Sequence, residues 1–157
     1  MFNVYLAGFI SGDQITECTE WRKKIRSYYL TKGWDNLTFL DPLNGNERND
    51  ISADGLTSQS IPGKCLVHRD HQSVKNSDLL IVNVDTFGAD RPLTGTIYEL
   101  AWAWQYKIPV IILGTNPNYV NHPFIIDTAS TFVETVDELI EKEYLKYFYQ
   151  GQVCARY

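Results

Sequence analysis

The sequence predicts an α/β domain over residues 1–157, with a doubly wound parallel sheet of about five strands flanked by helices. Short apolar runs of strand length alternate along the chain with longer segments of helical periodicity. One run, residues 78–84, is apolar almost throughout. Such a run is typical of a central parallel strand that helices cover on both faces. Alternating strands and helices imply parallel pairing through right-handed crossovers.

The first half of the chain supplies two of the expected strands. Residues 2–7 are mostly apolar and end at Gly8, which fits a buried strand followed by a tight turn. Residues 16–32 predict a helix with one buried face, and Gly33 is placed to end it. Residues 37–40 then predict the second strand.

A long polar stretch separates this strand from the next helix. Asp41-Pro42 ends the strand, and residues 44–60 are rich in Asn, Asp, Ser and Gly. Loops of this length are often lids or binding loops. Residues 61–76 then predict a helix that leads into the strand at 78–84.

The second half repeats the alternation. Residues 85–93 are expected to form a loop and residues 95–106 a helix. Residues 108–113 predict a fourth strand. Pro109 lies at its start, where the sheet does not need a backbone N–H to donate a hydrogen bond to the neighbouring strand. The last expected elements are a short strand at 131–133 and a helix at 136–148.

Composition excludes several classes of function. The chain has 14 Lys and Arg against 19 Asp and Glu, a net charge of −5, and it lacks a basic cluster, so we expect no nucleic-acid partner. Cys18, Cys65 and Cys154 are odd in number and widely spaced, which argues against a disulfide framework and a zinc site. We find no set of side chains with metal-ligand spacing. Without a signal-peptide pattern or an apolar run of about 20 residues, the expected location is cytoplasmic, away from membranes.

In doubly wound sheets, whether Rossmann-like or flavodoxin-like, ligands bind beyond the carboxyl ends of the strands, where strand order reverses. The segments expected there are residues 8–12, Asp41 with the loop that follows, and residues 85–96. Neither a GxGxxG fingerprint nor a phosphate-binding P-loop occurs in the sequence. Residues 8–12 form a loose glycine turn, which fits either a close approach to a ligand or a plain turn between strand and helix.

Carboxylates in these segments are the candidates for chemistry. Thr94 or Thr96 is placed to cap the helix at 95–106, and Glu99 then lies one turn inside it, facing the cleft. A glutamate in a first turn is also a common surface residue favoured by the helix dipole. Asp70 and Asp78 flank the entry to the third strand, where either fits a catalytic role or an ordinary cap or surface charge.

Three separated segments together resemble one protein family, the nucleoside 2-deoxyribosyltransferases. They are Val4-Tyr-Leu-Ala-Gly8, Arg69-Asp70 followed by residues 78–83, and Gly95-Thr-Ile-Tyr-Glu99-Leu-Ala followed by residues 107–111. The resemblance spans most of residues 2–113. The paired occurrence of Asp70-x7-Asp78 with the GTxxE motif is more specific than either part.

The resemblance implies roles for individual residues. Glu99 matches the nucleophile, Asp70 matches the residue that holds the nucleobase and its leaving-group proton, and Tyr5 matches the tyrosine that positions the glutamate. Tyr157 matches a C-terminal tyrosine that reaches an active site in members of the family. The positions expected to contact substrate are Gly8, Asp78, Asp90, Arg91, Gly95, Thr96 and Tyr157.

One position departs from the resemblance. The transferases usually carry an Asp six residues before the nucleophile, and related nucleoside-monophosphate N-glycosidases often carry Ser there to meet a 5′-phosphate. This chain has Leu93. Asp90 and Arg91, from the same loop, are the candidates to replace that contact.

The implied activity is cofactor-independent transfer of deoxyribose from a 2′-deoxynucleoside to a free nucleobase through a covalent glutamyl-sugar intermediate. Two alternatives are an N-glycosidase that hydrolyses (deoxy)nucleoside 5′-monophosphates and a nucleotide-binding module without catalysis. Exclusion of water separates transfer from hydrolysis. The resemblance also implies a homo-oligomer.

Overall fold

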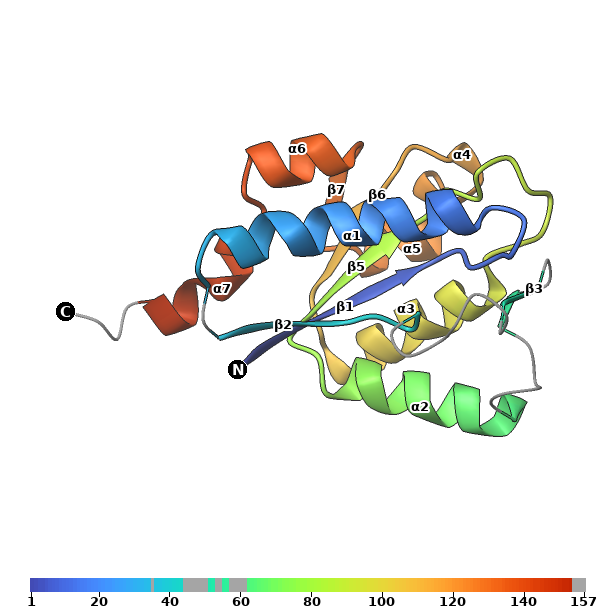
Figure 1. The fold of residues 1–157 in the computed structure, drawn as a ribbon, viewed down its shortest axis with the longest axis horizontal. Coiled ribbons are helices and arrows are strands. Elements are labelled where there is room, and N and C mark those ends of the chain that lie inside the picture. The colour runs from blue at the N-terminus through green and yellow to red at the C-terminus, as the bar shows by residue number, and fades with distance from the viewer. Residues whose placement is uncertain (35, 44–50, 53–54, 57–61, 154–157) are drawn as a thin grey trace.

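Five parallel strands form one sheet with the order β2-β1-β5-β6-β7 (Figure 1). They are β1 (Phe2–Gly8), β2 (Leu37–Leu40), β5 (Leu79–Asn83), β6 (Val110–Leu113) and β7 (Thr131–Val133). The chain steps from β1 to one side and then crosses back to β5 on the other, so strand order reverses at β1. This is the flavodoxin-like order, and it confirms the predicted fold class.

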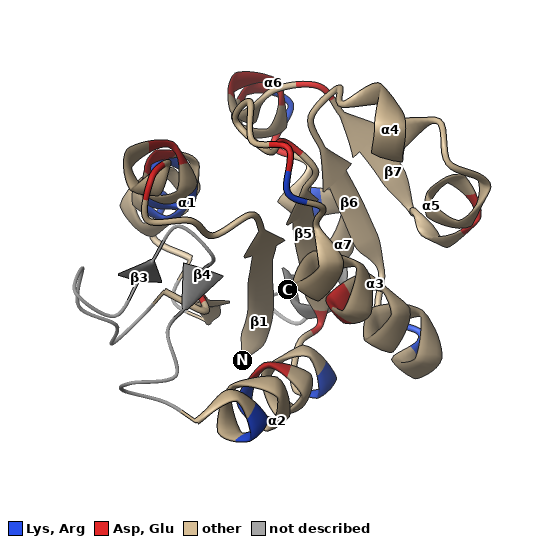
Figure 2. Ribbon diagram, turned by 90° about the vertical axis from the view of Figure 1, so that its right-hand side faces the viewer, with Lys and Arg blue, Asp and Glu red and all other residues tan. Residues whose placement is uncertain are grey.

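The computed structural model describes residues 1–34, 36–43, 51–52, 55–56 and 62–153. In this part of the chain, helices cover both faces of the sheet (Figure 2). One face packs against α1 (Ile15–Thr31), α6 (Val136–Glu141) and α7 (Leu145–Val153). The other packs against α2 (Gly63–Lys75), α3 (Thr94–Tyr106) and α5 (Pro123–Thr128).

Side chains alternate along β1 between the hydrophobic cores on the two faces of the sheet. Val4 and Leu6 belong to the core on the α1 side, whereas Tyr5 and Ala7 belong to the core on the α3 side. Every residue of β5 is buried, as expected of a central strand covered on both faces. Pro109 precedes β6, and its carbonyl accepts a hydrogen bond of 3.0 Å from the backbone N–H of Leu80.

The prediction of one continuous helix over residues 136–148 is wrong. The structure has two helices, α6 and α7, and Glu143 between them has a positive φ of 48°. After this turn the Tyr149 ring stacks on Trp34 at 4.6 Å and meets Phe2 edge-on at 5.3 Å. This packing against the amino end of β1 fixes the direction of α7, a tertiary constraint that helical periodicity does not record.

Several short elements were not predicted. The helices α4 (Pro117–Val120) and α5 lie between β6 and β7, and β3 (Ile51–Ser52) pairs antiparallel with β4 (Gly55–Leu56). The rest of the predicted polar loop at 44–60 lies outside the described residues. In the described segments, no helix combines the length and the apolar character needed to cross a membrane.

Gly8 ends β1 at a point where there is no space for a side chain. A Cβ atom there would lie 3.0 Å from Cζ2 of Trp21 and 3.2 Å from Cβ of Asn83. Both neighbours are buried, so neither has free space to move into. Glycine therefore lets α1 and β5 close on the end of β1.

We expect Gly8→Ala to destabilise the fold by about 1–3 kcal/mol, because overpacking forces neighbouring groups apart. For a domain of this size the melting temperature falls by roughly 3–10 °C. Gly63→Ala is the matched control, since a Cβ at Gly63 meets nothing within 4 Å. Thermal unfolding followed by circular dichroism measures both, and equal melting temperatures for the two variants would contradict the close contact at Gly8.

Candidate active site

A cavity of about 210 Å³ opens at the carboxyl end of β1, where strand order reverses. It is the position at which doubly wound sheets bind ligands. Its walls come from the end of β1 and the turn after it, from α2, and from the loop and first turns of α3. The lining residues are Gly8, Phe9, Ile10, Pro42, Leu66, Asp70, Arg91, Pro92, Leu93, Thr94, Gly95, Thr96 and Glu99.

Glu99 lines this cavity and is hydrogen-bonded to Tyr5, which is not itself one of the lining residues. The Tyr5 hydroxyl donates a hydrogen bond of 2.6 Å to Oε1 of Glu99, and both side chains are buried. Tyr5 reaches Glu99 because it lies on the face of β1 that packs against α3. Residues 94 positions apart in sequence thus meet through the adjacency of a strand and a helix.

Burial raises the pKa of Glu99 to about 8. The hydrogen bond from Tyr5 lowers this pKa, the charge of Asp70 raises it, and the cations Arg22 and Arg69 lower it. Burial and the adjacent Glu99 also raise the pKa of Tyr5 well above its ordinary value. The phenol therefore keeps its proton and remains a hydrogen-bond donor to the carboxylate.

Asp70 lies on α2, across the cavity from the loop that precedes α3. Nε and Nη2 of Arg69 both lie 2.9 Å from its Oδ1 atom. Burial raises the pKa of Asp70, and the charge and hydrogen bonds of Arg69 oppose that rise. A second cavity of about 140 Å³ shares Asp70 and Pro42 with the first and is also lined by Tyr5 and Arg69.

No sequence pattern indicated the buried ion pair that supports the end of β1. Arg22 is fully buried and donates hydrogen bonds to the carbonyls of Gly8, at 3.1 Å, and Cys18. Its Nε lies 3.5 Å from Oδ1 of Asp41, whose other oxygen lies 3.0 Å from Arg26. Arg22 neighbours the apolar stripe of α1. Its burial depends on carbonyl groups, such as that of Gly8, which come close to it only in the folded protein.

The structure brings most of the expected substrate-contacting residues to the cavity. Gly8, Arg91, Gly95 and Thr96 line it, as do Asp70 and Glu99. Asp90 is exposed and is absent from the lining, whereas the neighbouring Arg91 packs its guanidinium over the Phe9 ring at 4.6 Å.

Asp78 lies at the other end of the sheet. Its carboxylate accepts a hydrogen bond of 2.8 Å from the backbone N–H of Asn3, before β5 begins. The structure therefore gives Asp78 a contact that fixes the register of β1 and β5, remote from the cavity. Tyr157 lies outside the described residues.

The start of α3 differs from the expected cap. Leu93 is the N-cap residue and no side chain caps the helix, so neither Thr94 nor Thr96 has that role. The Leu93 side chain is buried, and its backbone N–H donates a hydrogen bond of 2.9 Å to the Tyr119 hydroxyl. Leu93 therefore places an apolar side chain on the wall of the cavity.

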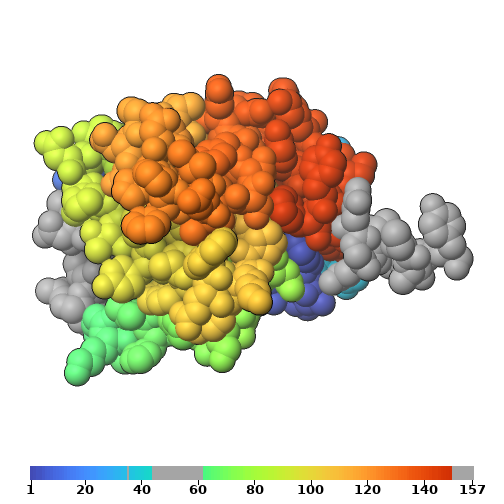
Figure 3. Space-filling model, turned by 180° about the vertical axis from the view of Figure 1, so that it is seen from behind, coloured from blue at the N-terminus to red at the C-terminus, as the bar shows by residue number. Residues whose placement is uncertain are grey.

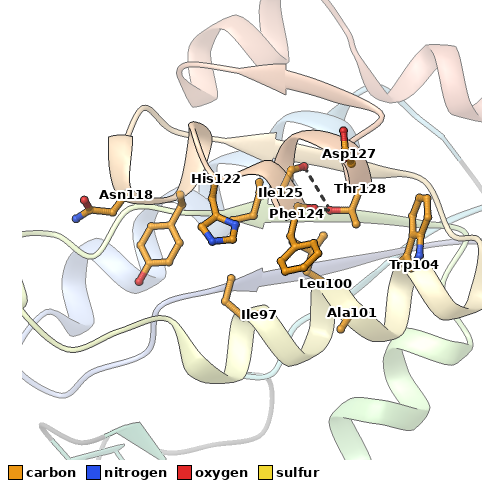
Figure 4. Close-up of a pocket in the computed structure, with 11 residues that line it drawn as sticks. Ile97, Leu100, Ala101, Trp104, Asn118, His122, Phe124, Ile125, Asp127 and Thr128 are labelled. Carbon is orange, nitrogen blue, oxygen red and sulfur yellow. Dashed lines mark hydrogen bonds between the residues drawn. The ribbon is translucent and has the colours of Figure 1, made fainter.

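A larger groove of about 640 Å³ runs between α3 and the segment that contains α4 and α5 (Figure 4). The yellow and orange surfaces of these elements meet on the face shown in Figure 3. Its lining is mostly apolar and includes Leu100, Trp104 and Phe124, with Asp127 as its one carboxylate among the described residues. The smaller cavity, with two carboxylates, is therefore the better candidate for acid–base or nucleophilic chemistry. Among the described residues, no group of three or more His, Cys, Asp or Glu side chains is placed to hold a metal ion.

Two solved structures have similar folds. A conserved protein from Enterococcus faecalis V583 superposes with a TM-score of 0.63 at 18% identity, covering 93% of this chain and 99% of that one. The CMP N-glycosidase BcmB from Clostridium botulinum superposes with a TM-score of 0.54 at 16% identity, covering 91% and 98% of the two chains. At these identities the likeness establishes the fold alone.

Among curated protein sequences, none matches this chain at a significant level. The sequence profile of the nucleoside 2-deoxyribosyltransferases, in contrast, matches residues 4–142, which is most of the chain. That range contains Tyr5, Asp70 and Glu99. The protein therefore belongs to the nucleoside 2-deoxyribosyltransferase family, and this membership supports an enzyme that transfers a glycosyl group or cleaves an N-glycosidic bond.

Proposed function

We propose that this protein cleaves the N-glycosidic bond of 2′-deoxynucleosides and transfers the deoxyribose to another nucleobase through a covalent ester on Glu99. The observation that carries the proposal is the 2.6 Å hydrogen bond between the Tyr5 hydroxyl and the buried Glu99 carboxylate. Asp70, on the wall of the same cavity, supplies the second carboxylate. Family membership supports the type of reaction.

In the first half-reaction, a Glu99 oxygen attacks C1′ of the sugar. The N-glycosidic bond breaks, its electron pair goes to the base nitrogen, and the base takes up a proton from the carboxyl group of Asp70. Tyr5 holds Oε1, which leaves Oε2 as the attacking atom. Deoxyribose suits this route, because it lacks the electron-withdrawing 2′-hydroxyl that would destabilise the oxocarbenium-like transition state.

Burial of Glu99 has a consequence for the dependence of the rate on pH. With its pKa raised to about 8, Glu99 in the free enzyme holds a proton at neutral pH. Only the ionised carboxylate attacks C1′, so the acid limb of kcat/KM reports the loss of this proton. The hydrogen bond from Tyr5 favours the ionised form.

In the second half-reaction, a nitrogen of the incoming base attacks C1′, Glu99 departs as a carboxylate, and the base releases a proton. Water in place of the base would hydrolyse the ester. Apolar side chains on the wall of the cavity, among them Phe9, Ile10 and Leu93, limit the room for water near the sugar.

A second candidate function is hydrolysis of (deoxy)nucleoside 5′-monophosphates. Arg91 favours it, because its cation lines the cavity close to the amino end of α3, where backbone N–H groups also attract anions. Nε of Arg91 is buried without a hydrogen-bond partner in the described structure. The Clostridium botulinum protein of similar fold is a CMP N-glycosidase. A non-catalytic binding module is the third alternative.

Incubation of the protein with deoxyinosine and free adenine tests the proposal. We expect deoxyadenosine and hypoxanthine as products, and chromatography of the reaction mixture measures both. Release of free deoxyribose would indicate a hydrolase. A parallel incubation uses deoxyinosine 5′-monophosphate. Cleavage of this nucleotide without cleavage of deoxyinosine would favour the second candidate, and cleavage of neither would favour the binding module.

Glu99→Ala is expected to lower transfer by several orders of magnitude with the fold intact, because both half-reactions need this carboxylate. Glu20→Ala is the matched control, since Glu20 is an exposed glutamate on α1. Near-normal activity of the Glu99 variant would remove this residue from the mechanism.

Asp70→Asn is expected to slow the departure of adenine or cytosine far more than that of nitrophenol from a nitrophenyl deoxyriboside. General acid assistance is worth about 10² to 10⁴-fold, and only a poor leaving group needs it. Steady-state rates on the two substrates give the comparison. Equal losses on both would assign Asp70 to binding or structure alone.

A further inference from the structure

Arg69 makes an unusual set of contacts at the edge of the candidate active site. Its Nε and Nη2 both lie 2.9 Å from one oxygen of Asp70, Oδ1. Nη2 also donates a hydrogen bond of 3.2 Å to the carbonyl of Pro42, after β2. Both contacts of Arg69 with Asp70 therefore go to Oδ1, and neither goes to Oδ2.

These contacts are not those of an ordinary surface ion pair. Consecutive residues on a helix do not face each other, so the Arg69 side chain must fold back to reach Asp70. The Pro42 carbonyl fixes the guanidinium from the side of β2, and the Asp70 side chain is 16% exposed. The planar guanidinium is bound both to the Pro42 carbonyl and to Oδ1 of Asp70, so it restricts the rotation of the Asp70 carboxylate.

Resting on the function proposed above, we propose that Arg69 is a positioning residue for Asp70. It binds Oδ1 and leaves Oδ2 as the single oxygen that exchanges a proton or hydrogen bond with the nucleobase. Asp70 lines both cavities, whereas Arg69 lines only the smaller one.

The charge of Arg69 acts on two carboxylates in the same direction. Burial raises the pKa of Asp70 and of Glu99, and the charge of Arg69 lowers both. Loss of the cation therefore lets both carboxyl groups keep their protons to higher pH. The other charged or titratable groups at these two cavities, among the described residues, are Tyr5 on β1, Asp41 after β2 and Arg91 before α3.

Two substitutions separate charge from geometry. Arg69→Gln removes the cation, so we expect the acid limb of kcat/KM to move to higher pH. Arg69→Lys keeps the cation but cannot hold one oxygen with two N–H groups, so the acid limb stays near that of the wild type while kcat on deoxyadenosine falls. Lys75→Gln is the matched control, because it removes an exposed cation at the far end of α2 and leaves both cavities intact.

Leaving-group dependence distinguishes positioning from a merely structural role. Both Arg69 variants should lose roughly tenfold or more on deoxyadenosine relative to a nitrophenyl deoxyriboside, which needs no proton on its leaving group. The Lys75 variant should keep the wild-type ratio. Unchanged ratios in both Arg69 variants would overturn the proposal.

A measurement without turnover tests the pair independently of the proposed reaction. In ¹³C NMR titrations of the carboxyl groups, the Asp70 signal of Arg69→Gln should titrate at higher pH than in the wild type. An unchanged Asp70 titration contradicts the pairing. A shifted titration with unchanged kinetics contradicts the role in catalysis, and wild-type protein that cleaves no deoxynucleoside or nucleotide overturns the proposed function itself.

Discussion

The burial of one carboxylate against one phenol is the constraint on which the site depends. Glu99 is 7% exposed and Tyr5 is 1% exposed, and a hydrogen bond of 2.6 Å joins them. A buried carboxyl group is costly to ionise unless hydrogen bonds compensate, so strand and helix must hold the pair in register. The parallel sheet does this because β1 packs directly under α3. Reactivity of the carboxylate and rigidity of the fold then follow from the same packing.

The reversal of strand order at β1 explains why the remaining polar groups gather here. Segments after β1 and β2, the start of α3 and the side of α2 converge on the same end of the sheet. The buried Arg22–Asp41 pair joins the ends of β1 and β2 from the opposite layer. Removal of Asp41 would leave the buried Arg22 without its carboxylate, whereas removal of Arg22 would leave Asp41 paired with Arg26. Polar contacts from both helical layers thus hold the end of β1 in place.

Sequence patterns predicted the strands of the five-stranded sheet and the parallel fold, because local periodicity records them. Glu99 and Asp70, which family motifs singled out, both lie on the wall of the cavity, and their roles stay predictions. Sequence patterns failed where tertiary contacts matter: the predicted last helix is broken at Glu143, after which Tyr149 packs on Trp34, and Asp78 accepts a hydrogen bond from the backbone of β1. Burial of Arg22 and the contact of Arg69 with Asp70 likewise depend on segments far apart in the chain or on side-chain rotamers, which spacing alone does not encode.

The central claim is that Glu99 forms a covalent bond to the sugar. Incubation with a 2-fluoro-2-deoxynucleoside, followed by proteolysis and mass spectrometry, tests it most directly, because the fluorine slows breakdown of the ester. We predict the added mass of one fluorinated sugar on the peptide that contains Glu99, and no label in Glu99→Ala. A label on another residue, or turnover of natural substrate by wild-type protein whose Glu99 never carries the label, would contradict the claim.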